Sequence, residues 1–290
     1  FYGNIYLINS GTINYTNNSP GGTKALYSMW NALPDDPNPF RVENHGIINV
    51  TGSSALPYSS TVMAHHYGHL SSTALGQHTF INDGTINLNN ALGYLQDYST
   101  GIYDATSGGI MNVNTNAVGI ELTLIGNSER IFNQSTLKVG TINVNGDSNA
   151  GGAYSKAVNI ALGSFPTITI EISDGTINLR SNSLGIITNT IDQETINNSA
   201  AINITGGNSY GFISYGGGYP FSLAQINNSG DISVNVSGST LLSAGIYHQI
   251  ITSFTNTGNI RVNSTGINSS GLAGILLDPE AVFTNDGTGG

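Results

Sequence analysis

Cysteine is absent from the 290 residues of this chain. The fold therefore has no disulfide framework, no thiolate metal site and no cysteine nucleophile. Charge is also scarce, since charged residues make up 8% of the sequence, against about 25% in an average soluble domain. Folding must depend on backbone hydrogen bonds and on stacked, mostly uncharged side chains.

Basic residues are the scarcest charged group, with 7 lysines and arginines against 17 acids and a net charge of −10. A protein that neutralises phosphates needs a basic stripe, so we expect no nucleic-acid partner. No apolar run approaches the roughly 20 residues of a membrane-spanning helix, and we expect no membrane insertion of this segment. Its first ten residues lack the basic and apolar regions of a signal peptide. We interpret the chain as a mature region or a piece of a longer protein.

Glycine, by contrast, supplies 38 residues, and asparagine is about as common. Both favour turns, because glycine reaches positive φ freely and asparagine tolerates the left-handed region. Together with 38% hydrophobic residues, this composition predicts many short strands separated by turns. Disorder is the alternative for such a composition, and the regular placement of Ile, Val and Leu argues against it.

A degenerate motif, apolar-x-Asn-x-Gly-x-Ile-x-apolar, recurs along the chain. Clear copies span residues 7–15, 42–50, 80–88, 226–234 and 254–262. The motif glycines stand at positions 11, 46, 84, 109, 140, 175, 230, 258 and 287, and Ala200 takes this place in one weak copy. The spacing between copies varies by insertion while the motif stays constant, which is typical of a solenoid.

A second half-motif, a glycine followed by an aliphatic or aromatic residue, follows many copies, for example at Gly119 and Gly211. It indicates at least two inward-facing strands in each coil. Alternate side chains of a strand share a face, so Ile86 is expected inside and Asn87 in solvent. We predict an all-β fold, a right-handed parallel β-helix (β-solenoid) of about nine to ten coils of roughly 25–38 residues. Residues 1–290 are expected to form a single domain.

Asparagine recurs two residues before the motif glycine. If the coils align, stacked amides hydrogen-bond from coil to coil along one turn. We expect these residues to be structural rather than to bind a ligand. The expected ladder consists of Asn9, Asn44, Asn82, Asn198, Asn228, Asn256 and Asn285.

Two segments, residues 16–41 and 52–78, depart from the repeat and lengthen their coils. We predict that they are loop insertions, which in repeat proteins emerge on one face and often bind a partner. A capping or packing role is the alternative. The partner-binding candidates within them are Tyr27, Trp30, Tyr58, His65, His66 and His69.

No arrangement of residues predicts a catalytic, cofactor-binding or metal site. His65, His66 and His69 suggest a metal cluster, but the zincin helix motif needs a glutamate where His66 stands. Many polysaccharide lyases and glycosidases are parallel β-helices, and their sites need converging acids. Asp83 and Asp174 each precede a motif glycine, but they lie too many coils apart to act together. We expect no enzyme activity, with a pectin-lyase-like polysaccharide-active enzyme as an alternative.

The phrase Asn-(Ser/Asp)-Gly-Thr-Ile-Asn at residues 9–14 and 82–87, and its shorter form at 174–178, resembles passenger regions of bacterial autotransporters. It is particularly similar to the fusobacterial and leptotrichial type, and filamentous-haemagglutinin-like exoproteins look alike at this level. The resemblance covers nearly the whole chain. It implies a secreted β-helix that displays loops for adhesion, and it carries over no catalytic residue.

We therefore expect an extracellular adhesin or structural stalk, secreted or held at the bacterial surface through an outer-membrane anchor outside this chain. Its loops would bind a host or bacterial cell-surface protein or glycan. The other alternative is a self-assembling extracellular filament, because exposed sheet ends template further strand pairing end to end.

Overall fold

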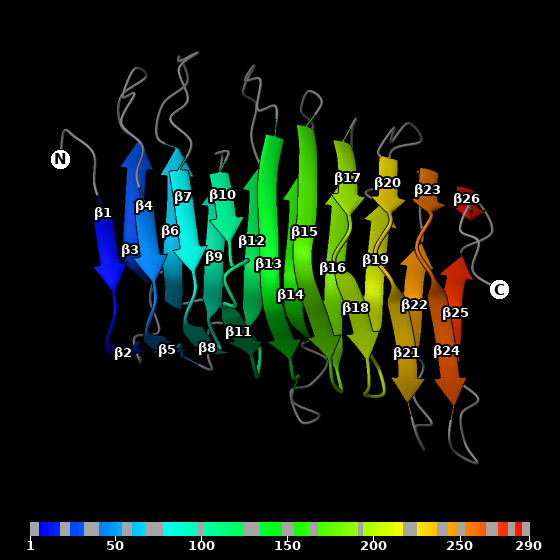
Figure 1. Ribbon diagram of the computed structural model, residues 1–290, viewed down its shortest axis with the longest axis horizontal. Coiled ribbons are helices and arrows are strands. Elements are labelled where there is room, and N and C mark those ends of the chain that lie inside the picture. The colour runs from blue at the N-terminus through cyan, green and yellow to red at the C-terminus, as the bar shows by residue number, and fades with distance from the viewer. Residues whose placement is uncertain are drawn as a thin grey trace.

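The computed structural model describes fifteen stretches of the chain: residues 6–17, 24–31, 41–53, 60–67, 78–97, 101–124, 134–146, 154–162, 168–190, 194–216, 225–236, 243–248, 253–264, 272–277 and 282–285. These residues form strands and turns without a helix. Neighbouring strands pair in parallel, and the chain winds as a right-handed β-solenoid, in agreement with the sequence prediction (Figure 1). Strands β1 and β26 lie at opposite ends of the elongated molecule.

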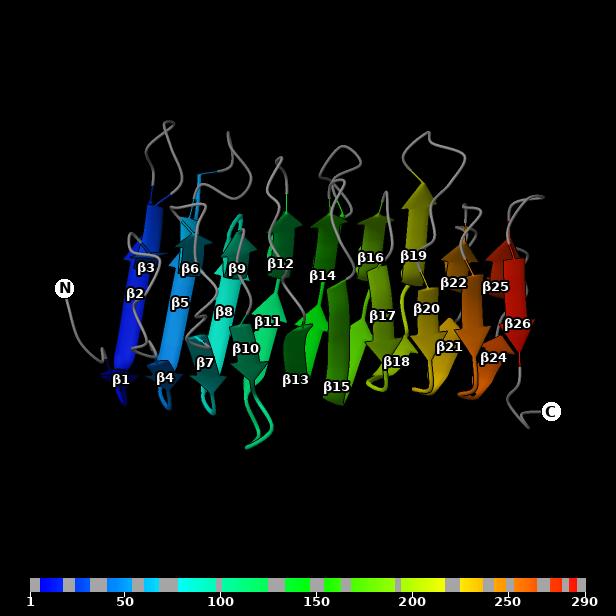
Figure 2. The ribbon, with the colours of Figure 1, turned by 90° about the horizontal axis from the view of Figure 1, so that it is seen from above.

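Strands at equivalent places in successive coils stack into three lanes, numbered in the order in which the chain visits them (Figure 2). Lane 1 contains β1 (Tyr6–Asn9), β4 (Arg41–Asn44), β7 (His78–Asn82), β10 (Gly101–Asp104), the first parts of β13 (Gln134–Val144) and β15 (Ile168–Leu179), β17 (Glu194–Asn198), β20 (Gln225–Asn228), β23 (Ser253–Asn256) and β26 (Val282–Asn285).

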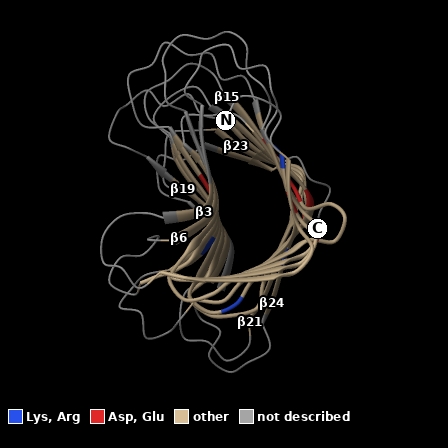
Figure 3. Ribbon diagram, turned by 90° about the vertical axis from the view of Figure 1, so that its left-hand side faces the viewer, with Lys and Arg blue, Asp and Glu red and all other residues tan. Residues whose placement is uncertain are grey.

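Lane 2 contains β2 (Thr12–Thr16), β5 (Ile47–Thr51), β8 (Thr85–Asn89), β11 (Ile110–Val113), the second parts of β13 and β15, β18 (Ala201–Ile204), β21 (Ile232–Val236) and β24 (Ile260–Ser264). Lane 3 contains β3 (Lys24–Asn31), β6 (Ser60–Tyr67), β9 (Leu92–Asp97), β12 (Val118–Leu124), β14 (Ser155–Leu162), β16 (Ser183–Thr190), β19 (Tyr210–Gly216), β22 (Ser243–His248) and β25 (Leu272–Leu277). The described strands thus make nine coils and the start of a tenth. A view along the axis shows the three sides of the solenoid (Figure 3).

The core is a set of columns in which equivalent side chains of successive coils stack on one another. In lane 2, Ile86 is in register with Met111, which is in register with Ile142, and all three are fully buried. Thr85 and Asn87, on either side of Ile86, are half-buried on the outer face. One coil cannot bury its inner face alone, so this column is formed only by stacking.

The glycines of both sequence motifs mark places where neighbouring coils approach too closely for a side chain. A Cβ at Gly84 would lie 2.1 Å from the carbonyl oxygen of Gly46 in the preceding coil. In lane 3, a Cβ at Gly185 would lie 2.2 Å from the carbonyl oxygen of Gly211 in the following coil. Glycine therefore recurs in the motif because a larger residue would collide with the backbone of the neighbouring coil.

The two segments expected to be loop insertions are loops only in part. Strand β3 lies within residues 16–41 and β6 within residues 52–78, and the two pair in parallel as the first strands of lane 3. The sequence did not predict these two strands, because they lack the Gly half-motif that marks most lane 3 strands in later coils. Residues 18–23, 32–40, 54–59 and 68–77 of these segments lie outside the described residues.

Candidate functional site

The asparagines that precede the motif glycines point inward and are hydrogen-bonded from coil to coil. Asn9 Nδ2 donates to Asn44 Oδ1 and Asn44 Nδ2 to Asn82 Oδ1, both at 2.8 Å. Asn9 also stabilises its own turn: its Oδ1 accepts from the Gly11 N–H at 3.1 Å, and its Nδ2 donates to the Gly11 carbonyl at 3.2 Å. Buried amides need such partners, because an unpaired buried polar group is costly.

The seven inner asparagines form two ladders instead of the single expected line. The second ladder runs through Asn198, Asn228, Asn256 and Asn285, with Nδ2–Oδ1 distances of 2.7, 2.7 and 2.8 Å. Three coils without an inner asparagine separate it from Asn82. Asn198 is in register with Ile172, and that column continues through Leu137 and Tyr103 to Phe80. The second ladder is therefore displaced by two residues from the line of Asn82.

A third ladder lies on the outer face of lane 2, where the sequence suggested only solvent-facing residues. It joins Asn14, Asn49, Asn87, Asn112, Asn143, Asn178 and Asn203, with Nδ2–Oδ1 distances between 2.7 and 3.1 Å. Its amides donate toward the N-terminal coil, whereas those of the inner ladders donate toward the C-terminal coil. The recurrent Asn that follows the motif isoleucine, as in the Thr-Ile-Asn phrase, was the signal available in the sequence.

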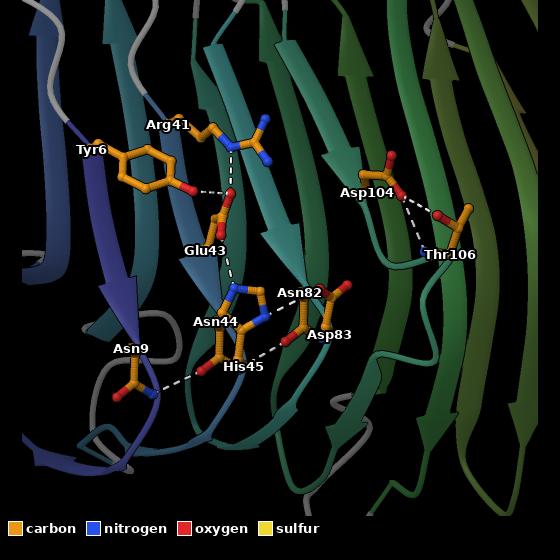
Figure 4. A network of polar contacts seen from close by, with 10 residues as sticks. All are labelled: Tyr6, Asn9, Arg41, Glu43, Asn44, His45, Asn82, Asp83, Asp104 and Thr106. Atoms are coloured by element: carbon orange, nitrogen blue, oxygen red, sulfur yellow. Dashed lines mark hydrogen bonds and ion pairs between the residues drawn. The ribbon is translucent and has the colours of Figure 1, made fainter.

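A polar cluster on the outer face of lane 1 ties the first three coils together (Figure 4). Glu43 accepts hydrogen bonds from the Tyr6 hydroxyl at 2.6 Å and from Arg41 Nε at 2.5 Å. Its second carboxylate oxygen lies 2.8 Å from His45 Nε2, and His45 Nδ1 lies 3.1 Å from Asp83. The Tyr6 hydrogen bond, followed by those from His45 and Arg41, lowers the pKa of Glu43 to about 2 against the opposing effect of burial. This cluster is a structural clamp between coils.

The partner-binding candidates lie in the first two coils. Tyr27 is half-buried and packs against the core, and burial raises its pKa. Trp30 on β3 is in register with His66 on β6, and Met29 is in register with His65. The structure thus brings Trp30 and His66 to adjacent places in lane 3. Tyr58 and His69 lie outside the described residues.

An open polar groove runs across coils 6 to 9, beside the corner where lane 1 turns into lane 2. Its volume is ≈ 430 Å³. One wall is a row of outward lane 1 side chains in register, Glu171, Asn197, Asn227 and Thr255. The other wall is a row of turn hydroxyls, Ser199, Ser229 and Thr257. Sequence reasoning missed this groove, because it combines single residues from four coils.

The two walls offer different hydrogen-bonding groups. Asn197 Nδ2 donates to Glu171 Oε1 at 2.7 Å, and Asn227 Nδ2 donates to Asn197 Oδ1 at 2.9 Å. The Ser229 hydroxyl lies 3.2 Å from the Asn198 carbonyl, which the Ser229 N–H already contacts at 2.7 Å. Such a hydroxyl contact is longer than an ordinary O–H···O hydrogen bond, so the hydroxyl can rotate toward another partner. Glu171 is the only charged side chain among the described residues that line the groove.

The described part of the chain holds no group of three or more His, Asp or Glu side chains placed to bind a metal ion. It also contains no helix long and apolar enough to cross a membrane. The lanes and ladders define the chain as a parallel β-solenoid. No family model, curated protein sequence or solved structure matches it.

Proposed function

We propose that this chain is the rod of an extracellular bacterial adhesin, which presents the connections between its strands to a cell-surface protein or glycan. The observation that carries the proposal is the contrast between constant strands and variable connections. Strands of successive coils keep register, so connections at equivalent places must leave the solenoid along one line. A scaffold of regular strands with variable loops is a common arrangement for binding.

The junction from lane 3 to lane 1 differs in length between coils, and it follows the strands that carry Trp30, His65 and His66. It comprises residues 32–40 in coil 1, 68–77 in coil 2 and 125–133 in coil 4, but only 98–100 in coil 3 and 191–193 in coil 6. Trp30 is the last residue but one of β3, which leads into the first of these connections, and His69 lies within the second. These positions favour the first two junctions as the adhesive surface.

The test uses the short connections of the chain itself. Residues 32–40 and 68–77 are each replaced by the sequence of residues 191–193, and the purified variants are immobilised on beads and titrated onto cultured epithelial cells and onto bacterial cells. We expect saturable binding by the parent chain and loss of binding by the double replacement. In the matched control, residues 125–133 are replaced in the same way and binding is retained.

Equal binding by the double replacement and the parent would contradict this assignment of the adhesive surface. Absence of binding by the parent chain to either cell type would contradict the adhesin proposal itself. Circular dichroism of each variant establishes that the strands are retained, so that loss of binding is not loss of the fold.

A further inference from the structure

We propose that the groove across coils 6 to 9 binds a neutral oligosaccharide that lies along the solenoid axis, with Glu171, Asn197 and Asn227 as its main hydrogen-bonding residues. This inference rests on the proposed function, because it names the class of glycan that the adhesin rod would bind. The site is separate from the connections of coils 1 and 2, because it is formed by β15, β17, β20 and β23 on the lane 1 face (Figure 1).

The row of amides presents donors and acceptors in alternation. Each Asn Nδ2 carries two hydrogens, and the contacts from Asn197 to Glu171 and from Asn227 to Asn197 use one hydrogen each. Asn227 Oδ1 and Glu171 Oε2 have no donor among the described side chains, so both can accept from a ligand. A sugar hydroxyl is both donor and acceptor and matches such a row.

The opposite wall adds rotatable hydroxyls at the same coil spacing. Ser199, Ser229 and Thr257 contact carbonyls of the preceding coil at 3.5, 3.2 and 3.4 Å, and these carbonyls are already paired with backbone N–H groups at 2.7–2.8 Å. Redirecting the hydroxyls to a ligand therefore leaves no buried carbonyl unpaired. The two walls repeat at about 4.8 Å per coil, which favours a ligand that is itself a chain of similar units.

The negative charge of Glu171 favours neutral saccharides over acidic ones in this groove. Glu171 is partly buried, and the other described lining residues are amides and hydroxyls. A carboxylate at one end of the groove repels uronate or sialate groups, and no lysine or arginine lines the described groove to offset it. A neutral glycan is therefore the favoured class.

The experiment is saturation-transfer NMR followed by calorimetric titration of the full chain with cellohexaose, maltohexaose, chitohexaose in its N-acetylated form, and hexagalacturonate. We expect binding of at least one neutral probe and weaker binding of hexagalacturonate. Ser229→Tyr should fill the groove and lower the affinity for the neutral probe at least about tenfold. Glu171→Gln keeps an acceptor for Asn197 and should reduce the discrimination against hexagalacturonate.

Thr205→Tyr is the matched control. Thr205 is an exposed turn residue whose N–H and hydroxyl contact the Leu179 carbonyl at 2.8 and 3.3 Å, as Ser229 contacts its own partner, but it does not line the groove. It should leave affinity within about twofold of the parent. Binding of none of the neutral probes, undiminished binding by Ser229→Tyr, or tighter binding of hexagalacturonate would overturn the proposal. Two crossed measurements test the two proposals separately. Ser229→Tyr should still adhere to cells if the connections of coils 1 and 2 are the adhesive surface. The double loop replacement should still bind the oligosaccharide if the groove is the glycan site.

Discussion

At the scale of single residues, three sets of asparagines differ in burial and in hydrogen-bond partners. Inner asparagines such as Asn228 bond their own turn and the next coil while fully buried. Outer asparagines such as Asn178 bond only their neighbours in the ladder and remain half-exposed. Asn197 and Asn227 belong to neither set and line the groove. Burial separates these sets energetically, because water replaces a lost partner only at the surface.

Replacement of one inner asparagine should therefore cost much more stability than replacement of an outer one. Asn228→Ala removes the acceptor of Asn198 and the donor to Asn256 at a buried position, and we expect a loss of roughly 2–4 kcal/mol in the free energy of unfolding. Asn178→Ala should cost about 1 kcal/mol or less. Urea unfolding followed by circular dichroism measures both, and equal losses would contradict the distinction.

The Glu43 cluster should make the free energy of unfolding depend on pH in the acidic range. Its pKa falls from an ordinary value of 4.5 to about 2 in the folded chain, mainly through the Tyr6 hydrogen bond. The clamp's contribution is therefore complete above pH 4.5 and is lost as the pH falls toward 2. Denaturant unfolding across this window should show a smaller pH dependence for Glu43→Gln than for the parent. Identical pH profiles would show that the clamp has no such effect.

At the scale of the element, the side chains of each strand stack on equivalent side chains of the neighbouring coils. From β2 to β18, the lane 2 strands have an apolar column on the inner face and an amide ladder on the outer face. The Ile of the Thr-Ile-Asn phrase belongs to the column and the Asn belongs to the ladder. In lane 1 the column changes its residue type along the solenoid, from Phe80 through Tyr103 and Leu137 to Ile172 and then Asn198. The lanes are thus equivalent in backbone but not in side-chain chemistry.

The close approach of coils at the motif glycines gives a paired prediction. Gly84→Ala places a Cβ against the Gly46 carbonyl, and the backbone must shift, so we expect a loss of about 1–3 kcal/mol. Gly11 occupies the same motif position in coil 1 and has no atom within 4 Å of the added Cβ. Gly11→Ala should therefore change stability by less than about 0.5 kcal/mol. Thermal and urea unfolding of the two variants test the pair, and a mild effect at Gly84 would contradict the packing argument.

The sequence allowed the coil lengths to be predicted, but not the division of each coil into lanes. The spacing of 35 residues from Gly11 to Gly46 reappears as the separation of Asn9 and Asn44, which are hydrogen-bonded across coils. The spacing between motif glycines gives the total number of residues in a coil, however, and does not locate the turns between its three strands. The two-residue displacement at Asn198 and the strands β3 and β6 were therefore missed. The groove was missed for a related reason, since Glu171 has no motif of its own.

At the scale of the whole molecule, the chain is an elongated solenoid rather than a compact globule (Figure 1). Ten lane 1 strands at about 4.8 Å give a length of roughly 45 Å along the axis. Charged residues are sparse along the described ribbon, where few positions are coloured as Lys, Arg, Asp or Glu (Figure 3). Its stability is expected to be a sum of contacts between adjacent coils, as in other solenoids. The adhesin proposal needs this rod to remain a single unit that carries its connections and its groove.

Small-angle X-ray scattering of the purified chain over a series of concentrations tests that requirement most directly. The account predicts a rod-like profile whose maximum dimension stays constant as the concentration rises, with a molecular mass of one chain. Growth of the maximum dimension and mass with concentration would contradict it. That result would make end-to-end assembly into filaments the primary role of the chain.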